Sequence, residues 1–88
     1  MQTLITPVAV YPSTANTLYI RAGNLGPPPQ YYYQLQNVAE DGNVVVLKDG
    51  NVNMTEAQWQ AWPADLGTQG DDDYQLNCIS ANLGLTRA

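Results

Sequence analysis

Residues 31–54 of the chain read YYYQLQNVAEDGNVVVLKDGNVNM, and this stretch decides the fold. Three of its segments are rich in the residue types that strands prefer, at 31–38, 44–48 and 51–54. The dipeptides Asp41-Gly42 and Asp49-Gly50 separate these segments. Asp-Gly readily adopts the positive φ angles of a tight hairpin turn. The stretch therefore predicts a three-stranded antiparallel meander.

Two further strands are predicted upstream of the meander. Residues 17–22 place Leu18 and Ile20 on one side and Tyr and Arg side chains on the other, the alternation typical of a half-buried strand. Residues 3–11 are also β-prone. Pro7 cannot donate a ladder hydrogen bond, so this segment is expected to be an edge or broken strand.

A glycine- and proline-rich segment, residues 23–29, connects residues 17–22 to the meander. It predicts a loop with a short extended proline stretch. Its three prolines are also compatible with a polyproline ligand, but flanking basic residues are lacking, which favours a rigid loop.

A short helix is expected within residues 55–63. Thr55 and Gln58 fit a capping box, in which the N-cap hydroxyl and the side chain three residues later each bond to the other's backbone. Pro63 ends the helix. Trp59 and the tryptophan three residues after it share a face, and we expect them to clamp the helix onto the sheet.

The last predicted element is a C-terminal helix within residues 73–84. Asp71, Asp72 and Asp73 stand at its start, where carboxylates oppose the positive end of the helix dipole. Gly84 is placed to end it as the C′ residue.

This helix carries two apolar stripes on nearly opposite sides. The stronger stripe consists of Leu76, Ile79 and Leu83. The milder stripe consists of Tyr74, Cys78, Ala81 and Leu85. A helix that is apolar on two sides is usually sandwiched. The sheet can cover one stripe, and the other needs the tryptophan helix or a neighbouring chain.

Together these elements predict one α+β domain that spans residues 1–88. Residues 1–54 are mainly β and form a small antiparallel sheet of four to five strands, including the meander. The sheet packs with a short tryptophan-containing helix and the C-terminal helix. With 88 residues, the chain is long enough for one domain and too short for two.

The composition favours a subunit of a larger assembly over a free monomer. Charged residues make up 12% of the chain, about half the usual fraction, and Lys48 is the single lysine. Asn and Gln, eight of each, fill much of the gap. Lysine and glutamate are depleted in interface cores, so a surface poor in both suits assembly.

The net charge of −5 excludes two classes of partner. Phosphate backbones need clustered Lys and Arg, so no nucleic-acid binding is expected. The same deficit argues against anionic membrane surfaces, and no apolar run reaches membrane-helix length. No signal peptide is expected at the N-terminus. The lone cysteine fits folding in a reducing cytoplasm.

The residue types point away from catalysis. The chain has no histidine, which removes the commonest general base and metal ligand. Cys78 lies within an amphipathic helix, which favours a small buried hydrophobe over a nucleophile. The run Asp71 to Asp73 fits helix capping better than a calcium loop, which needs staggered ligands. We therefore predict no enzyme activity, no metal and no cofactor.

The tyrosine run can be read in two ways. In a strand, Tyr31 and Tyr33 share one face and Tyr32 lies on the other. At least one face belongs to the core, and the remainder is either ordinary surface or a recognition patch.

The order of these features resembles small proteins encoded among the structural genes of tailed bacteriophages. The resemblance spans about residues 17–87 and is carried by Leu18-Tyr19-Ile20-Arg21, the glycine/proline loop, Tyr31-Tyr32-Tyr33-Gln34-Leu35, Asp49-Gly50-Asn51-Val52-Asn53-Met54-Thr55, the tryptophan helix, Asp72-Asp73-Tyr74 and Leu83-Gly84-Leu85-Thr86-Arg87. The triple proline and triple tyrosine depart from the expected pattern. The resemblance implies a virion protein, made in the bacterial host cytoplasm, that binds copies of itself or other virion proteins.

Three functions are therefore considered. The first is a virion structural protein, either associated with the tail, baseplate or fibre or decorating the capsid. The second is a peptide- or glycan-binding module that uses the tyrosine-rich strand, and the third is a phage-encoded inhibitor directed at the host. The candidate interface consists of exposed tyrosines of one strand and the milder helix stripe: Tyr31, Tyr32, Tyr33, Tyr74, Cys78, Ala81 and Leu85.

Overall fold

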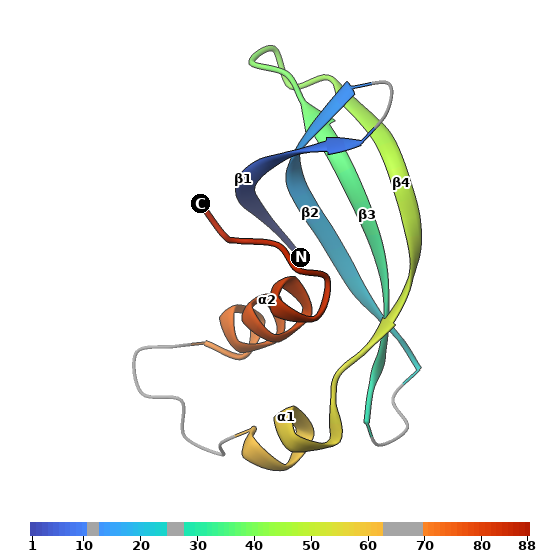
Figure 1. Cartoon of the computed structure of the whole chain (residues 1–88), viewed down its shortest axis with the longest axis vertical. Helices are drawn as coiled ribbons and strands as arrows, with labels where there is room; N and C mark the ends of the chain where they lie inside the picture. The colour runs from blue at the N-terminus through green and yellow to red at the C-terminus, as the bar shows by residue number, and fades with distance from the viewer. Residues whose placement is uncertain (11–12, 25–27, 63–69) are drawn as a thin grey trace.

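The computed structural model describes residues 1–10, 13–24, 28–62 and 70–88. These residues form a four-stranded antiparallel sheet and two helices, which is the predicted α+β class (Figure 1). The elements in chain order are β1 Gln2–Val10, β2 Ser13–Asn24, β3 Gln30–Val38, β4 Val44–Asn53, α1 Glu56–Ala61 and α2 Asp71–Asn82. The strands lie in the order β1-β2-β3-β4, so each strand pairs with the next along the chain. The predicted 23–29 loop is wrong at its start, because Gly23 and Asn24 belong to β2, and its residues 25–27 lie outside the described residues.

The first predicted hairpin turn is confirmed. Gly42 has a φ of 91°, and its N–H donates to the Ala39 carbonyl at 2.9 Å. The Ala39 N–H donates to the Asn43 carbonyl at 2.9 Å and closes the turn between β3 and β4. A positive φ is readily adopted by glycine because it has no Cβ.

The second predicted turn, at Asp49-Gly50, is wrong. β4 runs without a break from Val44 to Asn53, so the segments 44–48 and 51–54 form one strand. Gly50 pairs with Tyr33 of β3, and a Cβ on Gly50 would lie 3.1 Å from Cε1 of that ring. The glycine here allows the close approach of an aromatic ring across the strands, a role that glycine also has in sheets.

The two predicted upstream strands are both present. Leu18 and Ile20 of β2 are fully buried, as the alternation predicts. β1 is an edge strand, and its pairing with β2 shifts register between Leu4 and Val8, the segment that contains Pro7.

The capping box of α1 is confirmed. The Gln58 N–H donates to Thr55 Oγ1 at 3.1 Å, and the Thr55 N–H donates to Gln58 Oε1 at 2.9 Å. Trp59 and Trp62 pack edge to face, with ring centroids 5.9 Å apart. Both side chains border the core. The Trp62 ring also stacks on the Tyr74 ring of α2, so this indole joins the two helices.

The C-terminal helix starts two residues earlier than predicted. Its N-cap is Gly70, so Asp71, Asp72 and Asp73 form its first turn and still face the positive end of the dipole. Gly84 is the C′ residue with a φ of 71°. Its N–H donates to Ala81 O, and the N–H of Leu85 donates to Ser80 O, the two bonds of a Schellman motif.

The core lies between one face of the sheet and α2. Its largest fully buried side chains are Tyr31, Ile5, Leu18, Ile20, Met54 and Ile79. Both helices lie toward one end of the sheet, away from the turn at residues 39–43 (Figure 1). The turn end of β3 and β4 therefore extends beyond the helices.

Candidate interaction surface

The tyrosine run divides between the core and the surface. Tyr31 and Tyr33 are 1% and 8% exposed, so the core accounts for both. The Tyr31 hydroxyl donates to Oε1 of Gln75 at 2.6 Å. Burial, with a smaller contribution from Cys78, raises the pKa of Tyr31 to about 12. Of the three candidates, only Tyr32 lies on the opposite face of β3, where its side chain is half-buried.

The milder stripe of α2 is covered in part by α1 and in part by the core. Trp62 stacks on Tyr74 with centroids 5.4 Å apart, and the Tyr74 hydroxyl donates to the Gln58 carbonyl at 2.7 Å. Cys78 is buried, and Leu85 lies half-buried beyond the helix end. Of the four predicted interface residues on this stripe, Ala81 alone is exposed. The sequence left open whether the tryptophan helix or a neighbouring chain covers the second stripe, and the tryptophan helix covers part of it.

Cys78 is unsuited to nucleophilic chemistry. Burial raises the pKa of its thiol, and the opposing effect of the Tyr74 hydroxyl is smaller. Because the thiolate is the nucleophile, a buried thiol with a raised pKa is inert. Burial likewise raises the pKa of the Tyr74 phenol.

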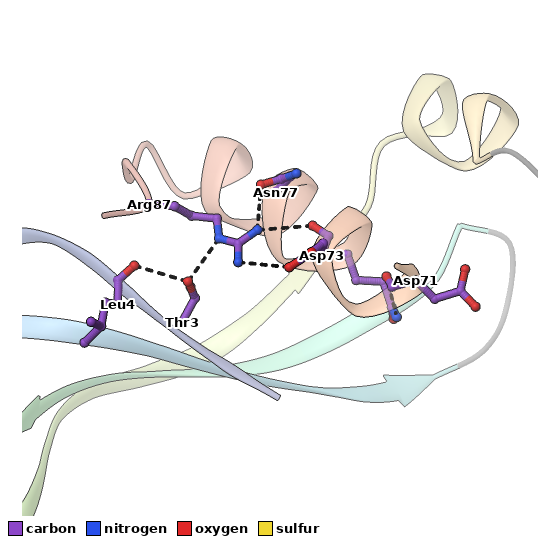
Figure 2. Close-up of polar contacts among 7 residues, drawn as sticks. Thr3, Leu4, Asp71, Asp73, Asn77 and Arg87 are labelled. Atoms are coloured by element: carbon purple, nitrogen blue, oxygen red, sulfur yellow. Dashed lines mark hydrogen bonds and ion pairs between the residues drawn. The ribbon is translucent and has the colours of Figure 1, made fainter. Parts of the chain in front are cut away.

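The aspartate run is occupied by contacts within the chain. Figure 2 shows the Arg87 guanidinium between β1 and α2, where it donates to Asp73 Oδ1 at 3.2 Å and to Asn77 Oδ1 at 2.8 Å. Its Nε donates to Thr3 Oγ1 at 3.0 Å. Asp71 accepts a 3.3 Å hydrogen bond from the Trp62 indole. In the described part of the chain, no group of three or more His, Cys, Asp or Glu residues could hold a metal ion.

One exposed surface is a polar network on the sheet face opposite α2, here called the tyrosine face. It consists of Arg21, Tyr32, Gln34 and Asp49, and it continues into the buried side chain of Gln36. The Arg21 guanidinium lies 5.0 Å from the centroid of the Tyr32 ring, and the Tyr32 hydroxyl donates to Asp49 Oδ2 at 3.0 Å. Gln34 donates to the Tyr32 hydroxyl at 3.0 Å, and Gln36 donates to Gln34 at 2.8 Å.

A second exposed surface lies on the edge strand β4. Val44, Val45 and Val46, here called the valine segment, are 53%, 55% and 47% exposed. The unpaired main-chain groups of an edge strand are a template for another strand, and exposed apolar side chains on that strand favour the pairing. This segment was predicted to be a strand, but its exposure was not predicted. The signal was available, because three successive valines place an apolar side chain on each face of a strand.

The two edge strands of the sheet, β1 and β4, differ in whether another segment of the chain pairs with them. On β1, the C-terminal residues 86–88, here called the tail segment, add main-chain pairing. The Thr6 N–H donates to Thr86 O at 2.8 Å, and the Ala88 N–H donates to Leu4 O at 3.0 Å. Ile5 forms an isolated antiparallel bridge with Arg87. Among the described residues, no segment pairs in this way with the outer edge of β4.

Comparison of the chain with known protein families, curated proteins and solved structures found no match. Within the described residues, no helix is long and apolar enough to cross a membrane.

Proposed function

We propose that this chain is a structural protein of a phage virion, without catalytic chemistry of its own, that works by joining protein chains through the outer edge of β4. The observation that carries the assembly role is the exposed valine segment on an edge strand that the chain leaves unpaired in its described part. The phage setting rests on the sequence resemblance. Tail, baseplate or fibre association and capsid decoration remain the two positions within this proposal.

The physical basis is strand addition. An edge strand presents unpaired N–H and C=O groups, and a partner strand can bond to them while its side chains cover the valines. The contrast with β1 supports a specific role for β4. Pro7, a register shift and the tail segment all interrupt the β1 edge, and these are common protections against unwanted pairing. On β4 the protections are Lys48 and an irregularity between Val46 and Lys48, and both lie beyond the valine segment.

The proposal is tested by the solution mass of the full chain, measured by light scattering coupled to gel filtration over a wide range of concentrations. We expect a defined oligomer that Val45→Lys dissociates, since a charged residue at the contact opposes burial. Leu4→Lys is the matched control, because Leu4 is 63% exposed but lies on β1. A monomer at every concentration would contradict self-assembly through β4 and leave only docking on another virion protein. An oligomer unaffected by Val45→Lys would contradict assembly through β4.

The second candidate function is recognition of a peptide or glycan by the tyrosine face. The specific observation in its favour is that Arg21, Tyr32 and Asp49 are held together in one network on the surface. Stacked rings, guanidinium groups and amides can supply both apolar contact and hydrogen bonds. Titration with peptides and glycans, followed by tyrosine and tryptophan fluorescence, tests it. Saturable binding by a monomer that is lost in Tyr32→Ala would favour this function over assembly.

A further inference from the structure

We infer that the partner of the β4 edge is a second copy of this chain, and that two β4 strands pair antiparallel about Val45 to give a closed twofold dimer with one continuous eight-stranded sheet. This inference rests on the proposed function and specifies its partner.

The direction of the main-chain groups on β4 supports strand pairing at the valine segment. The Ala39 N–H donates to Asn43 O, which makes these two residues a hydrogen-bonded pair of the ladder. Hydrogen-bonded and non-hydrogen-bonded pairs alternate along an antiparallel ladder. The pairs Val38↔Val44 and Gln36↔Val46 are then non-hydrogen-bonded. The N–H and C=O groups of Val44 and Val46 therefore point away from β3.

The pattern of outward main-chain groups at Val44 and Val46 is complementary to itself. A twofold axis perpendicular to the sheet at Val45 places Val44 of one copy opposite Val46 of the other. These two residues present their outward N–H and C=O groups, so the two copies can form a short ladder of hydrogen-bonded pairs. Val45 faces Val45 of the other copy in the closer, non-hydrogen-bonded type of pair.

Registers with the axis nearer the charged residues of β4 are disfavoured. A twofold axis at Lys48 places two lysines opposite each other, and an axis at Asp49 does the same for two aspartates. Like charges directly opposite each other are destabilising. An axis at Leu47 sets Val46 against Lys48, so an apolar side chain would meet a charged one. The axis at Val45 brings the six valines of the two segments together without a charged residue between them.

Pairing of β4 with β4 closes at two copies, whereas pairing of β4 with β1 does not close. If β4 of one copy paired with β1 of the next, the contact would be heterologous and could continue into an open polymer. The tail segment occupies main-chain groups of Leu4 and Thr6 and so obstructs that contact. Figure 1 shows the tail segment and β4 on opposite sides of the sheet. Pairing of β4 with β4 is isologous and closes at two copies.

Cysteine cross-linking tests both the partner and the register. In the inferred dimer the two Val45 Cα atoms lie about 4.5 Å apart, within disulfide range. We expect Val45→Cys to form a covalent dimer under mild oxidation. Val46→Cys alone is the matched control and should not cross-link, because its neighbour across the axis is Val44. A mixture of Val44→Cys and Val46→Cys chains should cross-link, and the wild type should not, since Cys78 is buried.

The outcomes separate the inference from the proposed function. A mass of two chains by light scattering, with cross-linking in the pattern above, supports the dimer. A ring or trimer that Val45→Lys dissociates would overturn the dimer and leave assembly through β4 standing. A dimer in which Val46→Cys cross-links as well as Val45→Cys would overturn the register. A monomer at every concentration would overturn the dimer and self-assembly through β4, and would leave only pairing of β4 with a different virion protein.

Discussion

The Tyr31 hydroxyl of β3 donates a 2.6 Å hydrogen bond to Oε1 of Gln75 in α2. This bond links the centre of the sheet to the C-terminal helix through a ring that is 1% exposed. We expect Tyr31→Phe to lower the free energy of unfolding by about 1 kcal/mol, because a buried hydrogen bond is lost and little volume changes. Urea unfolding followed by tryptophan fluorescence measures this. Tyr32→Phe is the control, since its hydroxyl lies in an exposed network, and a larger loss there would contradict the prediction.

The raised pKa of Tyr31 predicts how stability depends on pH. The ordinary phenol pKa is 10.0, and burial raises that of Tyr31 to about 12. Between these values the unfolded chain releases the proton and the folded chain retains it. The contribution of Tyr31 is therefore fully present below pH 10 and is lost as the pH rises toward 12.

Unfolding experiments at a series of alkaline pH values check this expectation. The shift corresponds to a loss of roughly 2–3 kcal/mol across that range. Tyr31→Phe should remove this part of the pH dependence and leave the contributions of Tyr74 and Cys78, whose pKa values are also raised. An unchanged slope in Tyr31→Phe would show that other groups dominate.

The contact between Gly50 and Tyr33 predicts sensitivity to a single added carbon. A Cβ at Gly50 would lie 3.1 Å from Cε1 of a ring that is 8% exposed, so the ring must shift. We expect Gly50→Ala to cost about 1 kcal/mol, the lower end of overpacking effects. Gly23→Ala is the control, because its Cβ would meet its nearest atom at an ordinary 3.7 Å. Equal stabilities of the two variants would show that the ring yields without cost.

Local signals in the sequence predicted much of the fold. The capping box at Thr55, the turn at Gly42 and the C′ glycine at Gly84 were predicted because each is a contact among near neighbours. The turn at Asp49-Gly50 was wrong because the dipeptide signal is local. The strand conformation at Gly50 depends on its pairing with Tyr33 of β3, which lies 17 residues away in sequence.

The candidate site was harder to predict, because exposure depends on which elements cover which face. Tyr74 and Cys78 belong to a real apolar stripe, but Trp62 and Gln58 cover Tyr74, and Cys78 is buried in the core near Tyr31. Val45 lies on the core side of β4 and is exposed because both helices lie toward the other end of the sheet, whereas Val44 and Val46 lie on the face opposite α2. Nothing in the local pattern of three valines states where the helices dock. The tail segment likewise pairs with β1 across more than 80 residues of sequence.

The last prediction follows from the asymmetry of the two edges. Deletion of residues 86–88 removes the main-chain bonds to Leu4 and Thr6 and the contacts of Arg87 with Thr3, Asp73 and Asn77. With β1 uncovered, β4 of one copy can pair with β1 of another, and such a heterologous contact need not close.

We expect the truncated chain to form species larger than a dimer, seen as a rising mass by light scattering and as elongated particles in negative stain. Arg87→Gln is the control, because it removes the guanidinium and keeps the backbone of the tail segment. That variant should remain the size of the wild type while losing some stability. Adding Val45→Lys to the truncated chain should abolish the large species, since growth would still require β4. Large species that persist in this double variant would show that they arise from unfolding and not from strand pairing.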